Sequence, residues 1–136
     1  MTTKAIIKGV ASALLLCATA AHADNSQRWQ YVGDGSGGAS VSVLKENLLA
    51  GRADQRDARM WVLFDARKVT ASDVYQVRSL VSVDCVAHTY RKVSTSIMYK
   101  DGTSSTNLEY GSALPVVPDS PMEIAVGLLC KTGGPA

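Results

Sequence analysis

The chain has 136 residues, of which 14 are lysine or arginine and 12 are aspartate or glutamate. This length fits one domain with one hydrophobic core. The near-balance of charge excludes a general electrostatic attraction to nucleic acid or to an anionic membrane surface.

The first 23 residues have the three-part pattern of a secretory signal peptide. Two lysines precede a short apolar run, and an Ala-His-Ala motif ending at Ala23 places small residues at the −3 and −1 positions before Asp24. The apolar run is shorter than the roughly 20 residues that a membrane span needs. We therefore predict a signal peptide over 1–23 and a single mature domain over 24–136. This domain is exported to the periplasm or secreted, with the cell surface as a further location, and has no transmembrane segment.

The three cysteines divide between the signal peptide and the mature domain. Cys17 follows three leucines in a pattern like a lipoprotein site, but a bulky leucine stands where such a site has a small residue, so we expect no lipidation there. Cleavage leaves Cys85 and Cys130, which an exported chain most simply joins in a disulfide. That bridge closes a loop of about 46 residues and stabilises the fold by roughly 4 kcal/mol. Cleavage also leaves twelve basic and twelve acidic residues.

Two strands and a glycine-rich turn are predicted at the start of the mature domain. Segments 28–32 and 40–45 have the aromatic and alternating apolar residues of strands. The GDGSGG stretch at 33–38 matches G-x-G-x-x-G, but a dinucleotide-binding loop must lead into a helix, and a β-type pattern follows here. We interpret this stretch as a hairpin loop.

The next segment combines an ambiguous stretch, a loop and a third strand. Leu48 and Leu49 fit either an extension of the preceding strand or a helical turn. Residues 52–59 alternate in charge without an apolar face, which predicts a solvated loop. Residues 60–65 are apolar on both faces, which indicates a central strand.

A long antiparallel hairpin is predicted over 75–99. The first strand has one apolar face, formed by Tyr75, Val77, Val81, Val83 and Cys85. Leu80 is the exception on the opposite, polar face. On the second strand, 88–99, strict alternation places Val93, Ile97 and Tyr99 on one face and Tyr90 and Met98 on the other. An Asp-Gly turn then leads to a last short strand at 105–110.

The C-terminal segment predicts an apolar helix. Ser120 caps it, Pro121 occupies its first position, and Glu123 completes a Ser-x-x-Glu capping box. We expect one apolar stripe with further apolar residues beside it; the stripe is Ile124, Gly127 and Leu128, and its neighbours are Val126, Leu129 and Cys130. Lys131 suits the negative helix end, and the glycines at 133–134 terminate the helix. The obvious cover for the helix is the sheet face that carries Cys85.

Four features together resemble the surface-adhesin protein E family of exported bacterial proteins. They are the early Trp29 strand, RMWVLFD at 59–65, VDCVAHTYRKVSTSIMYKDG at 83–102, and the PDSP…LLC ending. The resemblance spans nearly the whole mature domain. It implies an α+β fold, with a twisted antiparallel sheet of about six strands and a C-terminal helix held on one face by the Cys85–Cys130 disulfide. It also implies adhesion to host or matrix proteins at the cell surface.

No cluster of residues in the sequence predicts a catalytic, metal or cofactor site. His88 is the only histidine of the mature domain, and we place it on a polar strand surface. Asp84 is expected to pair with Arg78 or Lys92, an exposed pair worth little. The aromatic residues Trp29, Trp61 and Tyr90 are candidates for a binding surface, although aromatics in half-buried strands also pack in cores.

Three functions stay open from the sequence. The first is a non-catalytic, exported binding module of adhesin type with a protein partner. The second is a periplasmic structural or accessory protein, and the third and least favoured is a small hydrolase. We expect neither a nucleic-acid partner nor a cofactor, and a homodimer is compatible with the sequence.

Overall fold

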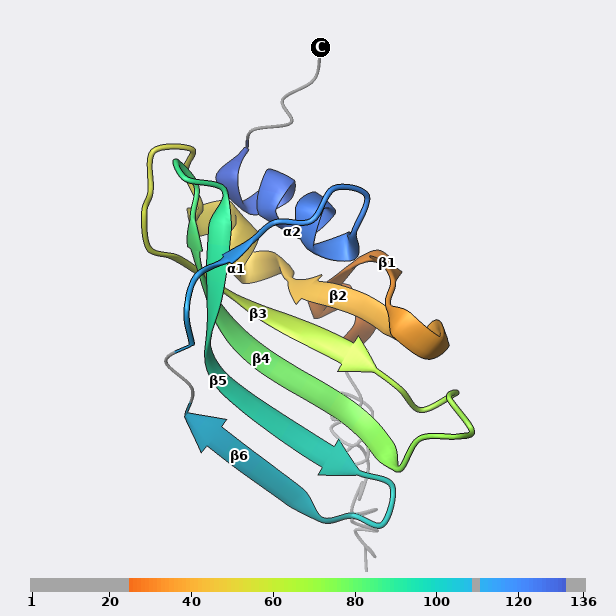
Figure 1. The fold of residues 1–136 in the computed structure, drawn as a ribbon. Helices are drawn as coiled ribbons and strands as arrows, with labels where there is room; N and C mark the ends of the chain where they lie inside the picture. Colours follow the sequence, from red (N-terminus) through yellow and green to blue (C-terminus); the bar gives the residue numbers. More distant parts are fainter. Residues whose placement is uncertain (1–24, 109–110, 132–136) are drawn as a thin grey trace, which may run out of the picture.

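The computed structural model describes residues 25–108 and 111–131, and it confirms the predicted α+β fold (Figure 1). One antiparallel sheet carries the first six strands in chain order, side by side, and a C-terminal helix lies across one face of its upper end. The predicted signal peptide, its cleavage site at Ala23 and Asp24, Cys17 and the terminal glycines lie outside the described residues. No described helix has the length and apolar character to cross a membrane.

The elements follow one another with short connections. In chain order they are η2 Asn25–Arg28, β1 Trp29–Asp34, η3 Ser36–Gly38, β2 Ser40–Leu44, α1 Lys45–Ala50, β3 Ala58–Asp65, β4 Val74–Asp84, β5 Thr89–Tyr99, β6 Ser104–Leu108, β7 Leu114–Pro115 and α2 Pro121–Cys130. The short strand β7 was not predicted; it pairs with the start of β5, on the same edge as β6.

The two sides of the sheet differ in burial. Side chains alternate between the sides of a strand, so each strand gives one set of residues to each side. We call the side covered by α1 and α2 the helix side. Its centre is fully buried and is formed by Val43, Met60, Val62, Val81 and Val83. We call the opposite side the open side, because neither helix covers it.

The beginning of the domain is a hairpin followed by a short helix. β1 and β2 pair antiparallel across the GDGSGG stretch, which contains the three-residue 3-10 turn η3 and leads into β2 instead of an α-helix, as the hairpin interpretation requires. The ambiguous leucines belong to α1, where Leu48 packs against the core and Leu49 is 82% exposed. Gly51 ends this helix close to Leu129 of α2, whose backbone oxygen would lie 2.0 Å from a β-carbon at this position. The two helices therefore meet where there is no room for a side chain.

Helix α2 buries only part of its predicted apolar face: Val126, Leu129 and Cys130, predicted beside the stripe, are buried, whereas the stripe itself is not. Its start shows the expected cap, in which the Glu123 backbone N–H donates to Ser120 Oγ over 3.3 Å. The stripe of Ile124 and Leu128 instead faces outward, and the exposed fractions of their surfaces are 53% and 41%, respectively. The buried set is Ala125, Val126, Leu129 and Cys130. Because nearly every residue of this helix is apolar, its sequence alone does not mark the inner face.

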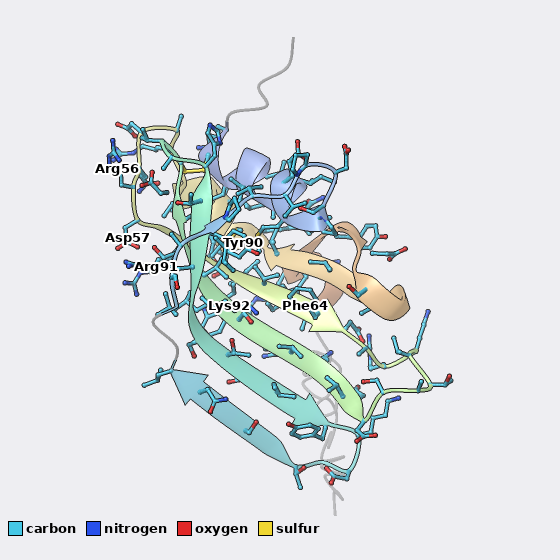
Figure 2. The ribbon with its side chains drawn as sticks, in the orientation of Figure 1. Arg56, Asp57, Phe64, Tyr90, Arg91 and Lys92 are labelled. Carbon is cyan, nitrogen blue, oxygen red and sulfur yellow. A yellow bond between two sulfur atoms is a disulfide. The ribbon has the colours of Figure 1, made fainter. Side chains whose placement is uncertain are left out.

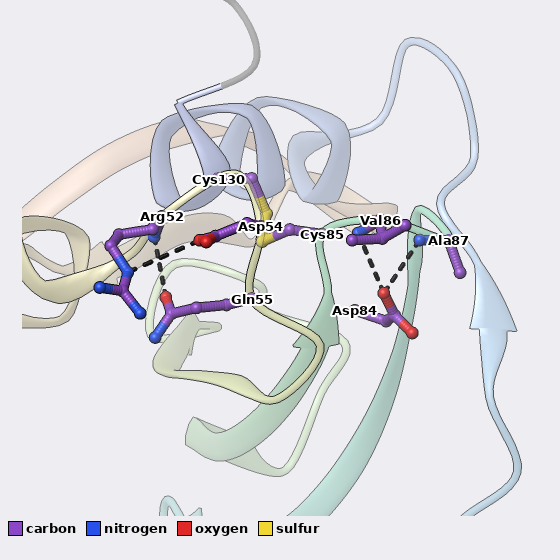
Figure 3. Close-up of a disulfide and its surroundings, with 8 residues drawn as sticks. All are labelled: Arg52, Asp54, Gln55, Asp84, Cys85, Val86, Ala87 and Cys130. Atoms are coloured by element: carbon purple, nitrogen blue, oxygen red, sulfur yellow. Dashed lines mark hydrogen bonds and ion pairs between the residues drawn. A yellow bond between two sulfur atoms is a disulfide. The ribbon is translucent and has the colours of Figure 1, made fainter.

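The Cys85–Cys130 disulfide joins the end of β4 to the last residue of α2 (Figure 3). The two Cα atoms are 5.5 Å apart, and the residues are 2% and 0% exposed. The Cys85 backbone N–H also donates to the Gln55 carbonyl over 2.8 Å, which ties the 51–57 loop to the same point. The predicted pairing of helix to sheet by this disulfide is confirmed.

The predicted partners of Asp84 were wrong. Its Oδ2 lies 3.6 Å from Nη1 of Arg56, and its Oδ1 accepts hydrogen bonds from the backbone N–H groups of Val86 and Ala87, both over 2.9 Å (Figure 3). The carboxylate therefore holds the tight turn after Cys85. His88 ends this turn with a left-handed φ of 56°, so it lies just before β5 instead of on the strand.

A β-bulge in β5 reverses the predicted alternation of that strand. Leu80 of β4 pairs with Ser94, whereas the next residue pairs with Lys92, so Val93 lies between the two pairs. The bulge shifts the phase of the strand by one residue. Tyr90 and Ile97, predicted on opposite faces, consequently both lie on the helix side, opposite Val83 and Val77.

Candidate functional site

Three rows of open-side residues run across the sheet from β1 to β6, and a shorter fourth row, formed by Arg59, Ser82 and Arg91, crosses β3, β4 and β5. The registers of the strand pairs place Trp29, Leu44, Trp61, Leu80, Ser94 and Leu108 in the first row. The second row is Tyr31, Ser42, Leu63, Arg78, Ser96 and Thr106. The third row is Asp34, Ser40, Asp65, Gln76, Met98 and Ser104. The three long rows therefore grade from apolar to polar, and the apolar row lies between the polar rows and the arginines of the fourth row.

Two adjoining hollows lie on the open side, and Trp61 and Arg78 line both of them. One hollow, of about 250 Å³, is completed by Arg28, Trp29 and Leu44. The other, of about 360 Å³, extends over β5 and β6, and its open-side lining includes Gln76, Ser96, Met98, Ser104 and Thr106. We call this pair of hollows the indole–arginine site. Both indoles are half-buried, so each exposes part of its ring to an incoming group.

Arg78 supplies the charge of the indole–arginine site. Its guanidinium carbon lies 6.0 Å from the ring centroid of Trp29, at the limit of a cation–π contact. None of the ion pairs formed by the described residues includes Arg78. Arg28, which also lines the site, instead pairs with Glu46 over 3.2 Å. Arg78 therefore carries a positive charge that no described carboxylate neutralises by direct contact.

The carboxylates of the open side have partners of their own. Asp65 receives three hydrogen bonds from the Arg67 side chain, over 2.6–2.9 Å. Burial raises the pKa of Asp65, but these bonds and the charge of Arg67 outweigh it and lower the pKa overall. Asp34 accepts from the Tyr31 hydroxyl over 2.8 Å, and this bond raises the pKa of the phenol.

Tyr90, the third aromatic candidate from the sequence, does not belong to this site. It lies on the helix side opposite Val83 and packs against the buried core (Figure 2). The structure thus brings Trp29 and Trp61 together and separates Tyr90 from them. Its role is packing, which was the alternative for all three residues.

A second polar cluster lies beside the 51–57 loop, where Figure 2 labels Arg56, Asp57 and Arg91. The buried Ser82 hydroxyl donates to Asp57, and Arg59 lies 3.6 Å from the same carboxylate oxygen. The hydrogen bond from Ser82, followed by the charges of Arg59 and Arg91, lowers the pKa of Asp57. Three arginines, Arg56, Arg59 and Arg91, meet two carboxylates here, Asp57 and Asp84, and Arg91 belongs to no ion pair among the described residues.

His88 lines a hollow of about 490 Å³ beside the exposed stripe of α2. Glu123 is the one carboxylate among the lining residues, and its side chain accepts a hydrogen bond from the Asp119 backbone. A hydrolase reading would need His88 together with two carboxylates, and this hollow does not supply them. Among residues 25–108 and 111–131, no group of three histidine, cysteine, aspartate or glutamate side chains is placed to hold a metal.

Sequence reasoning found the two tryptophans but missed Arg78. One signal was present, because Leu80 broke the alternation of β4 by placing an apolar residue on the polar face. Leu80 is the register partner of Trp61, and Arg78 is its neighbour two residues away on the same side. Leu80, an apolar residue beside an arginine on a polar face, was therefore the sequence signal for a binding surface on the open side.

Comparisons with known proteins give no relative for the chain: no family model, curated protein or solved structure matches it.

Proposed function

We propose that the protein is an exported, non-catalytic binding module of the cell envelope, which captures a protein partner on the open side of its sheet. The observation that carries this proposal is the indole–arginine site, where Trp29 and Trp61 line a hollow together with an arginine that has no described ion-pair partner. Tryptophan and arginine are the residues that contribute most often to strong protein–protein contacts. The resemblance to surface-adhesin protein E supports a host or matrix protein as that partner.

The arrangement of the two sides supports the same proposal. A domain of this size needs its hydrophobic residues for the core, and here the helix side already holds the fully buried set. The apolar row of the open side is only partly buried, and its β6 member, Leu108, is exposed. Partly exposed apolar residues that adjoin one another are typical of interaction surfaces.

A capture experiment tests the proposal. The exported, disulfide-bonded protein is immobilised and exposed to envelope extracts and to host-matrix extracts. We expect it to retain a specific protein, and we expect Trp61→Ala to reduce the retained amount at least about 10-fold, as hot-spot residues do. Leu49→Ala is the control, because it removes an exposed leucine that lines neither hollow and should leave capture unchanged. Equal capture by the protein and by Trp61→Ala would contradict the proposal.

The location of the partner is tested separately by protease treatment of intact cells. Cleavage in intact cells supports an adhesin that faces the host. Protection in intact cells, with cleavage only after the outer membrane is ruptured, would instead favour a periplasmic accessory protein whose partner is another envelope protein.

A further inference from the structure

We infer that the indole–arginine site recognises a carboxylate, presented by an acidic segment of the protein partner whose apolar neighbours pack on the two indoles. This inference rests on the proposed function, because it specifies the group that the same site binds. Its support comes from the hydrogen-bond donors, the charge and the shape of the two hollows.

The polar groups at the centre of the site are mainly hydrogen-bond donors. An indole offers one N–H and no acceptor, and a guanidinium offers five N–H donors and no acceptor. Among the hydrogen bonds of the described residues, none uses the side chain of Trp29, Trp61 or Arg78. A group bound between them must therefore accept hydrogen bonds.

The charge of the site selects an anionic acceptor over a neutral one. Arg78 belongs to no ion pair among the described residues, whereas the nearby carboxylates Glu46 and Asp65 are each held by another arginine. A carboxylate matches the fork of a guanidinium in a bidentate pair, which a carbonyl or hydroxyl does not. The indoles lie beside such a pair and offer apolar surface to the residues around the carboxylate.

The shape of the site favours a segment of chain over a single small anion. The two hollows adjoin at Trp61 and Arg78 and extend from β1 to β6, across the strands. The charge therefore lies near the middle, with apolar surface from Trp29 and Leu44 on one side and Met98 on the other. In a segment with an acidic residue between two apolar residues, the acidic side chain would pair with Arg78 and the apolar side chains would pack on the apolar surfaces on either side.

The two tryptophans of the chain make this inference directly measurable. The sequence contains two tryptophans, and both line the site, so every indole signal reports on it. The probes are two amidated peptides, acetyl-Leu-Glu-Leu-Glu-Leu and its neutral counterpart acetyl-Leu-Gln-Leu-Gln-Leu. They are titrated into the disulfide-bonded protein while the indole N–H resonances and the tryptophan fluorescence are recorded.

We expect the acidic peptide to shift both indole resonances and to bind about 10- to 100-fold more tightly than the neutral peptide, as for hydrogen bonds to a charged group. Added salt should weaken its binding. Arg78→Gln should remove the preference for the acidic peptide. Arg52→Gln is the matched control, because Arg52 is exposed in the 51–57 loop and lines neither hollow. Unchanged dispersion of the indole resonances verifies that each variant is folded.

Two results would overturn the carboxylate inference: equal binding of both peptides, or no shift of the indole resonances with either. The capture experiment separates this failure from a failure of the proposed function. If Arg78→Gln still captures the partner while Trp61→Ala does not, the open side binds protein but does not read a carboxylate. If both variants capture the partner as well as the original protein does, the proposed function itself fails.

Discussion

The two sides of the sheet are made by the same strands, yet they use apolar residues in different ways. On the helix side, Met60 and several valines are fully buried, and the disulfide holds α2 on this side of the sheet. On the open side, Trp29, Trp61 and Leu80 form a row that is only partly buried. Burial of apolar surface is the main stabilising term in folding. The helix side should therefore determine stability, and the open side should determine binding.

The largest expected effect is the loss of the disulfide that holds α2 on the helix side. Cys130→Ala should lower the free energy of unfolding by about 2–5 kcal/mol, because the unfolded chain regains the freedom that the bridge removes. Chemical denaturation measures this change. The purified mature domain without substitutions should also show no reactive thiol when it is titrated under denaturing, non-reducing conditions. Two reactive thiols per molecule, or an unchanged unfolding midpoint in Cys130→Ala, would refute the role of the bridge.

A pair of alanine substitutions compares the two sides directly. Met60→Ala removes a fully buried side chain on the helix side and should cost about 2–5 kcal/mol of stability. Leu80→Ala acts on the open side, where the residue is only partly buried, and should cost about 1 kcal/mol or less. Partner capture should show the reverse order, because Leu80→Ala should reduce the captured amount more than Met60→Ala does. Equal costs in denaturation would break the distinction between the sides.

Two glycine substitutions test how closely α2 is packed on its inner face. Gly51→Ala should destabilise by about 1–3 kcal/mol, because its β-carbon would meet the Leu129 backbone. Gly127→Ala lies within α2, has no atom within 4 Å of an added β-carbon, and should stabilise by about 0.5–1 kcal/mol through helix propensity. Thermal unfolding should therefore show shifts of opposite sign. Shifts of the same sign would contradict the close approach of the helices.

The smallest effect concerns the charged groups at the ends of the open side. The pKa of Asp57 is lowered in the folded protein, chiefly by the hydrogen bond from Ser82. Its contribution to stability is therefore present above the unfolded pKa of about 3.9 and is lost as the pH falls through the lower, folded pKa. Asp57→Asn should be less stable at neutral pH by under about 1 kcal/mol, because the group is exposed. This difference should narrow below about pH 4; a constant difference would exclude the charge as its cause.

Alternation predicted those parts of the fold in which one side of a strand is apolar and the other is polar. It assigned Val77, Val81 and Val83 of β4 to the helix side correctly, and with the capped C-terminal segment it predicted the helix joined to the sheet by Cys85 and Cys130. It failed in β5, because nothing in the sequence marks the bulge at Val93. The helical pattern also failed to mark the inner face of α2, because apolar residues surround that helix. Only its contacts with the sheet and with α1 select the residues that are buried.

The candidate site was predicted in part for a related reason. Trp29 and Trp61 were visible as aromatic residues, but whether Tyr90 joined them depended on which side of the sheet each strand presented. That choice is set by the register between strands, which is a long-range property. Arg78 was missed because a single arginine on a strand is ordinary until its neighbours across the sheet are known.

The position of the disulfide also decides what a protease can release. Cys85 and Cys130 are separated by 45 positions, so all of β5, β6 and β7 lie within one covalently closed loop. A single cut in the exposed stretch between β7 and α2 therefore opens the chain without detaching the helix. The two fragments stay together, and the indole–arginine site keeps its strands. One cut in this loop therefore leaves the helix and the sheet covalently joined.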